Sequence, residues 1–159
     1  MKTQAPVNNN LNQLYKRVII KHAKNPQNFG RLGKKYILSE GINPLCGDKI
    51  KIYVDLNQNN IIRKICFEGT GCAISIASTS LLTIALEKQK SNNAIKCAES
   101  LIKNLHNDSK SSINSVVNLD ELKALEGVKD FPSRIKCATL GWQTFLSSFS
   151  DNSTVITTE

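Results

Sequence analysis

Two side chains that can bind a metal or carry sulfur chemistry, Cys46 and Asp48, lie two positions apart. Gly47 separates them and lets the backbone bend, so both side chains can point in the same direction. A thiolate and a carboxylate in this arrangement suit a divalent metal ion. Two further cysteines, Cys72 and Cys137, carry sequence signals of their own, and the four residues together are candidate metal ligands.

The local sequence favours the thiolate forms of Cys72 and Cys137. Cys72 follows the Gly-Thr-Gly sequence of residues 69–71 and is expected at the N-terminus of a helix. The partial positive charge at that end of a helix lowers a thiol pKa. Cys137 lies near the start of the last expected helix, just after Arg134 and Lys136. These two cations are expected to tune the site or to take part in docking.

Three thiolates and one carboxylate form a four-ligand set for zinc, which is tetrahedral and accepts sulfur and oxygen ligands. The carboxylate is the harder donor, and closed structural zinc sites prefer cysteine and histidine. The spacing of the four residues matches no generic zinc motif. The residues alone therefore leave two interpretations open, a shared metal site and separate thiols.

The other cysteines and both histidines have plainer interpretations. Cys66 falls in an expected strand and Cys97 in an expected helix, so we interpret both as structural thiols. His22 and His106 are expected on polar helix faces, at the protein surface. The chain has five cysteines, and an odd number argues against a disulfide framework.

Hydrophobic periodicity predicts one hairpin and several helices. Apolar residues alternate along 49–56 and again along 61–68, and a polar turn joins these two segments. A further extended segment is expected around 36–42. The expected helices are 11–24, 72–87, 91–106, a short one at 119–125, and one that opens at Pro132 or Ser133 and carries Trp142 and Phe145 into the core.

This order of elements predicts an α+β fold, in which a small antiparallel sheet has helices packed on one face. The length of 159 residues indicates a single domain, 1–159. Polar composition indicates flexible tails at 1–10 and 151–159 and a mobile loop at 107–118.

Charge and hydropathy argue against a nucleic-acid-binding protein and against a membrane protein. The net charge is +8, but the basic residues are scattered, and aromatic residues make up only 6% of the chain. These features favour a solvated basic surface, or a face for an acidic protein partner, over a nucleic-acid binder. No uncharged apolar stretch reaches the length of about 18 residues typical of a membrane helix. Residues 1–10 show no secretory signal, so we expect no membrane association and a cytoplasmic location.

Five short sequence motifs occur in a characteristic order. They are LY (14–15), NPQNFG (25–30), NPLCGD (43–48), GTGCAIS (69–75) and RIKCATLGW (134–142). Together they resemble the U-type iron–sulfur cluster assembly family, over about residues 11–149. The fold that this resemblance implies, a small sheet with helices on one side, agrees with the fold predicted from periodicity.

Within that family the chain is most similar to the SufU-like branch. The scaffold branch usually carries a histidine immediately before its third cysteine, and Lys136 stands at that position here. The SufU-like branch also has extra residues between its second and third cysteines. The long polar region 88–118 resembles that insertion.

The resemblance implies roles for individual residues. Cys46, Asp48, Cys72 and Cys137 match the family's zinc ligands, and Cys46 matches the thiol that receives sulfur from the persulfide of a cysteine desulfurase. The implied function is a zinc-dependent sulfurtransferase in iron–sulfur cluster biogenesis. The implied partners are the desulfurase and a downstream SUF-type scaffold complex, and a weak homodimer is left open.

Three other functions remain open. Three cysteines and one aspartate could instead hold a 2Fe–2S cluster, which would make the chain a scaffold for cluster assembly. A structural zinc module that only binds a partner is a second alternative, and a nucleic-acid binder, suggested by charge alone, is a third. Lys136 in place of histidine favours the sulfurtransferase over the scaffold.

Overall fold

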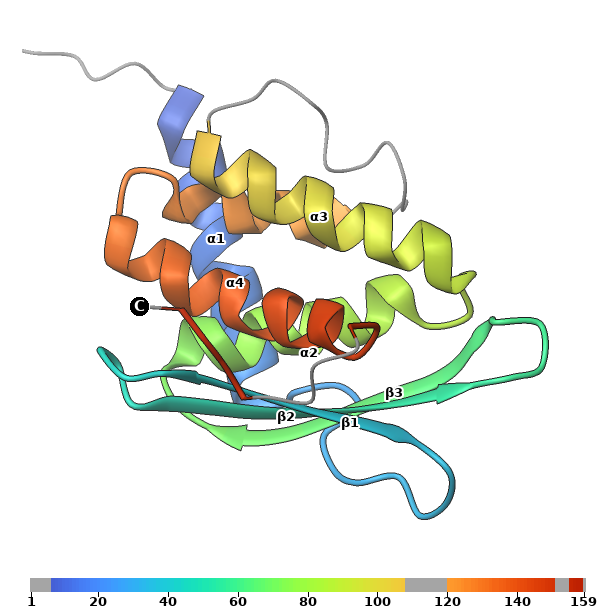
Figure 1. The fold of residues 1–159 in the computed structure, drawn as a ribbon. Helices are drawn as coiled ribbons and strands as arrows, with labels where there is room; N and C mark the ends of the chain where they lie inside the picture. The colour runs from blue at the N-terminus through green and yellow to red at the C-terminus, as the bar shows by residue number, and fades with distance from the viewer. Residues whose placement is uncertain (1–6, 108–119, 151–154, 159) are drawn as a thin grey trace, which may run out of the picture.

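The computed structural model describes residues 7–107, 120–150 and 155–158. Its elements form one layer of strands with the helices on one side of it (Figure 1). In chain order they are α1 (Val7–Lys24), β1 (Ile37–Asn43), β2 (Asp48–Leu56), β3 (Ile62–Thr70), α2 (Ala73–Leu86), α3 (Ser91–Asn107), the 3₁₀ helix η2 (Asp120–Val128), α4 (Pro132–Ser147) and β4 (Ile156–Thr157). As seen from the sheet, α3 lies beyond α2 and α4 (Figure 1).

The sheet contains four strands in the order β3-β2-β1-β4. β1, β2 and β3 are antiparallel neighbours, whereas β4 pairs with β1 in parallel at Gly41 and Ile42. The register of the β1–β2 hairpin places Asn43 directly opposite Asp48, next to the turn. The sheet is therefore mixed, where the sequence predicts an antiparallel one.

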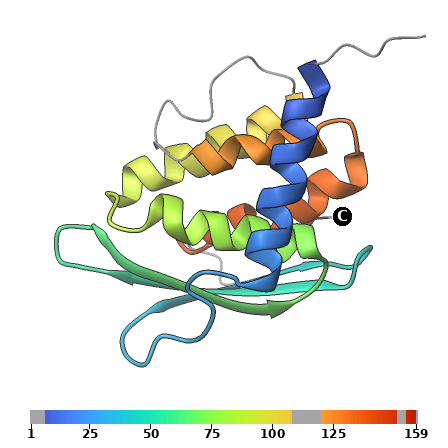
Figure 2. The same cartoon turned by 180° about the vertical axis from the view of Figure 1, so that it is seen from behind.

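The helices cover one face of the sheet, as Figure 1 and the reverse view in Figure 2 show. α4 packs against β1 and β2, and α2 packs against β3. Ile50, Ile52 and Val54 of β2 are at most 1% exposed, because alternate residues of a strand point to the same face. The predicted α+β fold with helices on one face is confirmed.

Helices α2 and α4 approach each other closely because small residues line their contact. Ser78 Oγ donates to the carbonyl oxygen of Ala138 and accepts a hydrogen bond of 2.9 Å from Trp142 Nε1. A Cβ atom on Gly141 would lie 2.3 Å from Thr79 Oγ1, so a side chain there would force a shift. This contact fixes the two helices that carry Cys72 and Cys137 relative to each other.

Both ends of the described chain differ in part from the predictions. α1 begins at Val7 rather than at residue 11, and β4 lies within the segment 151–159 that is predicted to be a tail. Thr158 N donates to Ile42 O, so backbone pairing with β1 orders this segment. Apart from Asn107, which belongs to α3, the predicted mobile loop at 107–118 lies outside the described residues.

His22 is only 1% exposed, so the prediction of a surface histidine is wrong. Its Nδ1 lies 2.7 Å from Ser80 Oγ, and its Nε2 lies 3.2 Å from Glu121 Oε2. Because Ser80 Oγ accepts the Gln27 N–H, its own hydrogen can bond Nδ1, which leaves the ring proton on Nε2. His22 is buried because it follows Val18 by four positions, on the apolar face of α1.

The predictions for two cysteines, His106 and two aromatic residues are confirmed. Cys66 and Cys97 are buried free thiols, and burial raises the pKa of both, that of Cys97 to about 11. His106 is exposed, and Trp142 and Phe145 are fully buried. No helix in the described part of the chain combines the length and the apolar character that crossing a bilayer requires.

Candidate functional site

The four candidate ligands come from the ends of three elements. Cys46 lies in the turn between β1 and β2, and Asp48 is the first residue of β2. Cys72 is the N-cap of α2, and Cys137 lies in the second turn of α4. These segments meet at one end of the molecule, on the left of Figure 1. Residues separated by most of the chain are thus brought together.

The distances among Cys46, Asp48 and Cys137 suit a single metal centre, and Cys72 lies next to this group, beside Asp48. The sulfur atoms of Cys46 and Cys137 are 3.2 Å apart, and Cys72 Sγ is 3.9 Å from Asp48 Oδ2. The donor atoms of Cys46, Asp48 and Cys137 all lie within 4.8 Å of one another. A group of soft sulfurs and one carboxylate oxygen at such distances could hold a metal ion.

The two carboxylate oxygens of Asp48 make different contacts. Oδ1 accepts a hydrogen bond of 2.8 Å from the backbone N–H of Cys72, at the start of α2. Oδ2 faces the sulfur of Cys72 and remains available as a single oxygen ligand. A Cβ atom on Gly71 would lie 2.4 Å from Oδ1, so the absence of a side chain at Gly71 permits this close approach.

The ligands differ in exposure. Cys46 is exposed, Cys72 is half-buried, and Cys137 and Asp48 are only 3% and 1% exposed. The φ angle of Gly47 is +70°, a conformation that favours glycine and that turns the chain at this point. Cys46 is therefore presented at the surface in front of three less accessible ligands.

Without a metal, burial dominates the thiol pKa values, and the expectation of lowered values for Cys72 and Cys137 is wrong. Burial raises the pKa of Cys72, although the backbone N–H of Ser75 at the helix N-terminus opposes this rise, as helix geometry predicts. Burial also raises the pKa of Cys137 strongly, and its contact with Cys46 adds to the increase. Both thiols are therefore protonated at neutral pH until a cation binds.

These shifts predict that metal binding releases protons. A metal ligand must be a thiolate, whereas the raised pKa values keep Cys72 and Cys137 protonated in the metal-free protein. We expect zinc binding to release about two or three protons at pH 7, and affinity to rise as the pH increases. Titration calorimetry in buffers of different ionisation enthalpy measures the number. Release of fewer than about one proton would contradict a site built on these thiols.

Arg134 and Lys136 flank Cys137 in sequence but differ in their surroundings. The guanidinium group of Arg134 lies over the ring of Phe131, 4.3 Å from its centroid. Its charge also opposes the increase that burial causes in the pKa of Tyr15. Lys136 is half-buried. The largest causes that shift the pKa of Cys137 are burial and the neighbouring Cys46, Cys72 and Asp48, so a role of Arg134 and Lys136 in tuning the site stays a prediction.

Sequence reasoning missed one residue of the site, Asn43. This residue is completely buried, and its amide Nδ2 lies 3.3 Å from Asp48 Oδ2 and 3.4 Å from Cys137 Sγ. A signal was present, because Asn43 continues the alternation of Ser39 and Gly41 on the buried face of β1. A buried polar residue next to metal ligands indicates a specific hydrogen-bonding role.

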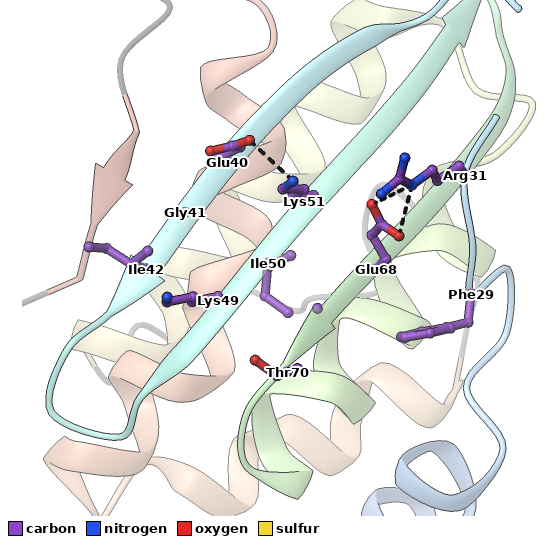
Figure 3. Close-up of a pocket in the computed structure, with 11 residues that line it drawn as sticks. Phe29, Arg31, Glu40, Gly41, Ile42, Lys49, Ile50, Lys51, Glu68 and Thr70 are labelled. Carbon is purple, nitrogen blue, oxygen red and sulfur yellow. Dashed lines mark hydrogen bonds and ion pairs between the residues drawn. The ribbon is translucent and has the colours of Figure 1, made fainter. Parts of the chain in front are cut away.

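A shallow pocket of about 380 Å³ lies on the opposite face of the sheet, away from the helices (Figure 3). Exposed side chains of β2, Lys49 and Lys51, lie at its centre, and Phe29 borders it. Its two carboxylates are already paired, Glu40 with Lys51 at 3.7 Å and Glu68 with Arg31 at 3.0 Å. None of the four candidate ligands is among the described residues that line it, so it is separate from the cysteine site.

Comparison with known proteins identifies the family. The NifU-like N terminal domain matches residues 14–138, most of the chain. The chain belongs to this family. The match includes all four candidate ligands and confirms the resemblance to the U-type iron–sulfur cluster assembly proteins.

Relatives in this family carry two kinds of name. The chain is 37% identical to the zinc-dependent sulfurtransferase SufU of Bacillus subtilis over 136 residues, which cover 86% of this chain and 89% of that protein. It is 35% identical to the iron–sulfur cluster assembly scaffold protein IscU of Streptococcus pyogenes over 135 residues, 83% of this chain and 80% of that protein.

Solved structures support the fold of this NifU-like domain. A SufU crystal structure from Fervidobacterium islandicum, described as an iron–sulfur cluster assembly scaffold protein for the SUF system, has a TM-score of 0.74 and 27% identity. The alignment covers 83% of this chain and 93% of that one. The N-terminal NifU-like protein of Brucella abortus has a TM-score of 0.71 over 87% of this chain and 93% of its own, and at 16% identity it supports the fold alone.

Proposed function

We propose that the protein is a zinc-dependent sulfurtransferase of iron–sulfur cluster biogenesis, which accepts sulfur on Cys46 from the persulfide of a cysteine desulfurase. The observation that carries this proposal is the unequal exposure of the ligands. Cys46 is exposed in a glycine-containing turn, while Asp48 and Cys137 are buried behind it. Only Cys46 combines accessibility to a large partner with contact to the buried group.

The transfer follows the chemistry of thiol–disulfide exchange. The thiolate of Cys46 attacks the outer sulfur of the desulfurase persulfide, and a new sulfur–sulfur bond forms. The sulfur–sulfur bond of the persulfide breaks at the same time, and the desulfurase cysteine leaves as a thiolate. Cys46 then carries the persulfide, with no net change in oxidation state or in the number of protons.

Asp48, Cys72 and Cys137, together with Cys46, would hold the zinc ion. When bound, zinc supplies positive charge that keeps its sulfur ligands as thiolates at neutral pH. This supply matters here because burial alone raises the pKa of Cys72 and Cys137. Asn43 donates to Asp48 and Cys137 and so helps to fix the two buried ligands.

The proposed partners are a cysteine desulfurase, as sulfur donor, and a downstream SUF-type scaffold complex, as acceptor. The relative from Bacillus subtilis supports the first part, since it is named a zinc-dependent sulfurtransferase. The five cysteines are all free thiols, which suits the reducing conditions of the cytoplasm, our proposed location.

A second candidate function is a scaffold on which a 2Fe–2S cluster is assembled. One specific observation favours it, the 35% identity to a protein named an IscU scaffold over most of both chains. The same three sulfurs and the same carboxylate could ligate iron. A scaffold would acquire colour when iron and sulfide are supplied, whereas a sulfurtransferase would speed up the desulfurase without a coloured product.

The deciding experiment measures turnover of the cognate cysteine desulfurase with and without the zinc-loaded protein. We expect stimulation by the parent protein and by Cys66→Ala, a control that removes a buried cysteine far from the ligands. We expect none from Cys46→Ala. Mass spectrometry should detect one added sulfur atom on Cys46 in the parent.

Two outcomes would count against sulfur transfer. Equal stimulation by Cys46→Ala would remove Cys46 from the pathway of sulfur. No stimulation by the parent, together with a brown cluster after addition of iron and sulfide, would favour the scaffold function.

A further inference from the structure

Asn43 contacts three of the four candidate ligands. Its backbone carbonyl accepts from the N–H of Cys46 at 3.3 Å, which closes the turn. Its side-chain Nδ2 lies 3.3 Å from Asp48 Oδ2 and 3.4 Å from Cys137 Sγ. As the last residue of β1, paired with Asp48 across the hairpin, Asn43 is held in place by the sheet.

The amide orientation follows from the charge of its neighbours. A carboxylate and a thiolate both accept hydrogen bonds, so the two N–H groups of the amide suit them and the carbonyl oxygen would be repelled. Hydrogen bonds to charged acceptors are roughly twice as strong as neutral ones. The side chain of Asn43 is therefore complementary to Asp48 and Cys137 in the ionised forms that a bound metal requires.

The carbonyl oxygen of the Asn43 side chain does not stabilise the fold. Asn43 Oδ1 is buried and has no hydrogen-bond partner among the described residues. A buried polar atom without a partner costs about 1–3 kcal/mol. An apolar residue of the same shape would avoid this cost, so the two N–H contacts to the ligands are what an amide offers at this position.

The contacts of Asn43 distinguish the ligands from one another. Asp48 and Cys137 each receive a side-chain hydrogen bond, and both are buried. Asn43 contacts Cys46 only through the backbone N–H of Cys46, and Cys46 is exposed. Cys72 is held separately, because its sulfur accepts from the backbone N–H of Ser75 at the start of α2. In the segments that the structure describes, the sulfur of Cys46 contacts only that of Cys137, so Cys46 is the least constrained of the four ligands.

We propose that Asn43 is a positioning residue that holds Asp48 and Cys137 as permanent ligands and thereby makes Cys46 the ligand that is released. This inference deepens the proposed function, on which its biological purpose rests. Its physical content concerns only the order in which the sulfur ligands become reactive. That order can be measured without a desulfurase.

The test uses the zinc-loaded full chain and the variants Asn43→Leu, which matches the shape of asparagine without hydrogen bonds, and Asn43→Ala. The matched control is Ser39→Ala, another buried polar residue of β1, whose partner is Ser148 rather than a ligand. Two quantities are measured. Chelator competition gives the zinc affinity, and mass spectrometry after timed iodoacetamide treatment gives the alkylation rate of each cysteine.

In the parent and in Ser39→Ala we expect Cys46 to react first, while Cys137 stays protected. In both Asn43 variants we expect zinc affinity to fall about 10- to 100-fold, the usual effect of removing a hydrogen-bond partner of a ligand. Alkylation of Cys137 in the zinc-loaded variants should rise by a similar factor. Cys66 and Cys97 are buried and serve as internal references in each sample.

A purely structural role gives a different result, because it would lower the melting temperature without changing the order of alkylation. Retention of Cys137 protection in a folded Asn43→Leu or Asn43→Ala protein would overturn the proposal, whatever the zinc affinity. Should Asn43→Leu fail to fold, Asn43→Ala carries the same comparison. Failure of sulfur transfer to Cys46 would leave this result unaffected, so the two proposals fail separately.

Discussion

Replacing Asp48 by asparagine should remove tight metal binding and leave the fold intact. The new side chain keeps an oxygen that can accept the N–H of Cys72, as Asp48 Oδ1 does at 2.8 Å. Its amide nitrogen replaces Oδ2, and that group neither ligates a metal nor suits the neighbouring N–H donor of Asn43. The expected loss of zinc affinity exceeds the roughly 10- to 100-fold that removal of a ligand's hydrogen-bond partner costs.

Two further variants make the Asp48 experiment specific. Asp55→Asn changes the same chemical group at the other end of β2, where Asp55 pairs with Arg63, and should bind zinc normally. Asp48→Ala also leaves the N–H of Cys72 without its partner, so it should lower the free energy of unfolding by about 1–3 kcal/mol as well. Chelator competition and urea unfolding of the metal-free proteins measure both effects. Normal zinc affinity in Asp48→Asn would remove Asp48 from the ligand set.

Trp142→Ala should lower the free energy of unfolding by about 3–5 kcal/mol, the usual range for a buried aromatic side chain. Trp142 is fully buried in α4, and its Nε1 donates to Ser78 Oγ of α2. Proteins of this class are stable by only about 5–15 kcal/mol. The variant would therefore lose a large fraction of its stability, and the helices that carry Cys72 and Cys137 would lose one of the contacts between them.

Trp142→Phe is the appropriate comparison, since it keeps most of the apolar volume and removes the hydrogen bond. It should cost less than Trp142→Ala. Urea unfolding followed by far-ultraviolet circular dichroism suits both variants, because Trp142 is the only tryptophan and fluorescence would be lost. A cost below about 1 kcal/mol for Trp142→Ala would mean that the contact between α2 and α4 relaxes around the cavity.

The sheet and most helices could be predicted because their patterns are local. The alternation of Ile50, Ile52 and Val54 gives both the strand and its buried face. β4 could not be predicted in this way. It has only two residues, and its parallel pairing with Gly41 and Ile42 joins segments more than a hundred positions apart. Such pairing leaves no periodic signal in either segment.

His22 shows where residue type outweighed periodicity in the prediction. Its position, four residues after Val18, places it on the buried face of α1, but a histidine is more often found at the surface. The buried environment is supplied by Ser80 and Glu121, far away in the sequence. A polar residue on the apolar face of a helix thus indicates a hydrogen-bond partner elsewhere in the chain. The sequence pattern does not identify that partner.

The grouping of the site could be inferred only from the resemblance to a family, because the spacing of the cysteines matches no generic motif. The structure brings Cys46, Asp48 and Cys137 together and places Cys72 next to Asp48. Asn43 is the first residue of the NPLCGD motif, yet its contacts depend on the register of the hairpin and on the position of α4. Both are tertiary properties, and neither can be read from the sequence of the motif.

The parallel pairing of β4 determines how another protein can approach this end of the molecule. An open edge strand offers unpaired backbone groups to which a partner can add a strand of its own. Near the candidate metal site the outer edge of β1 is already used, because β4 pairs with Gly41 and Ile42, and Thr158 N donates to Ile42 O. A partner therefore cannot add a strand directly to β1 at Gly41 and Ile42, and at these residues it has to be recognised through side chains.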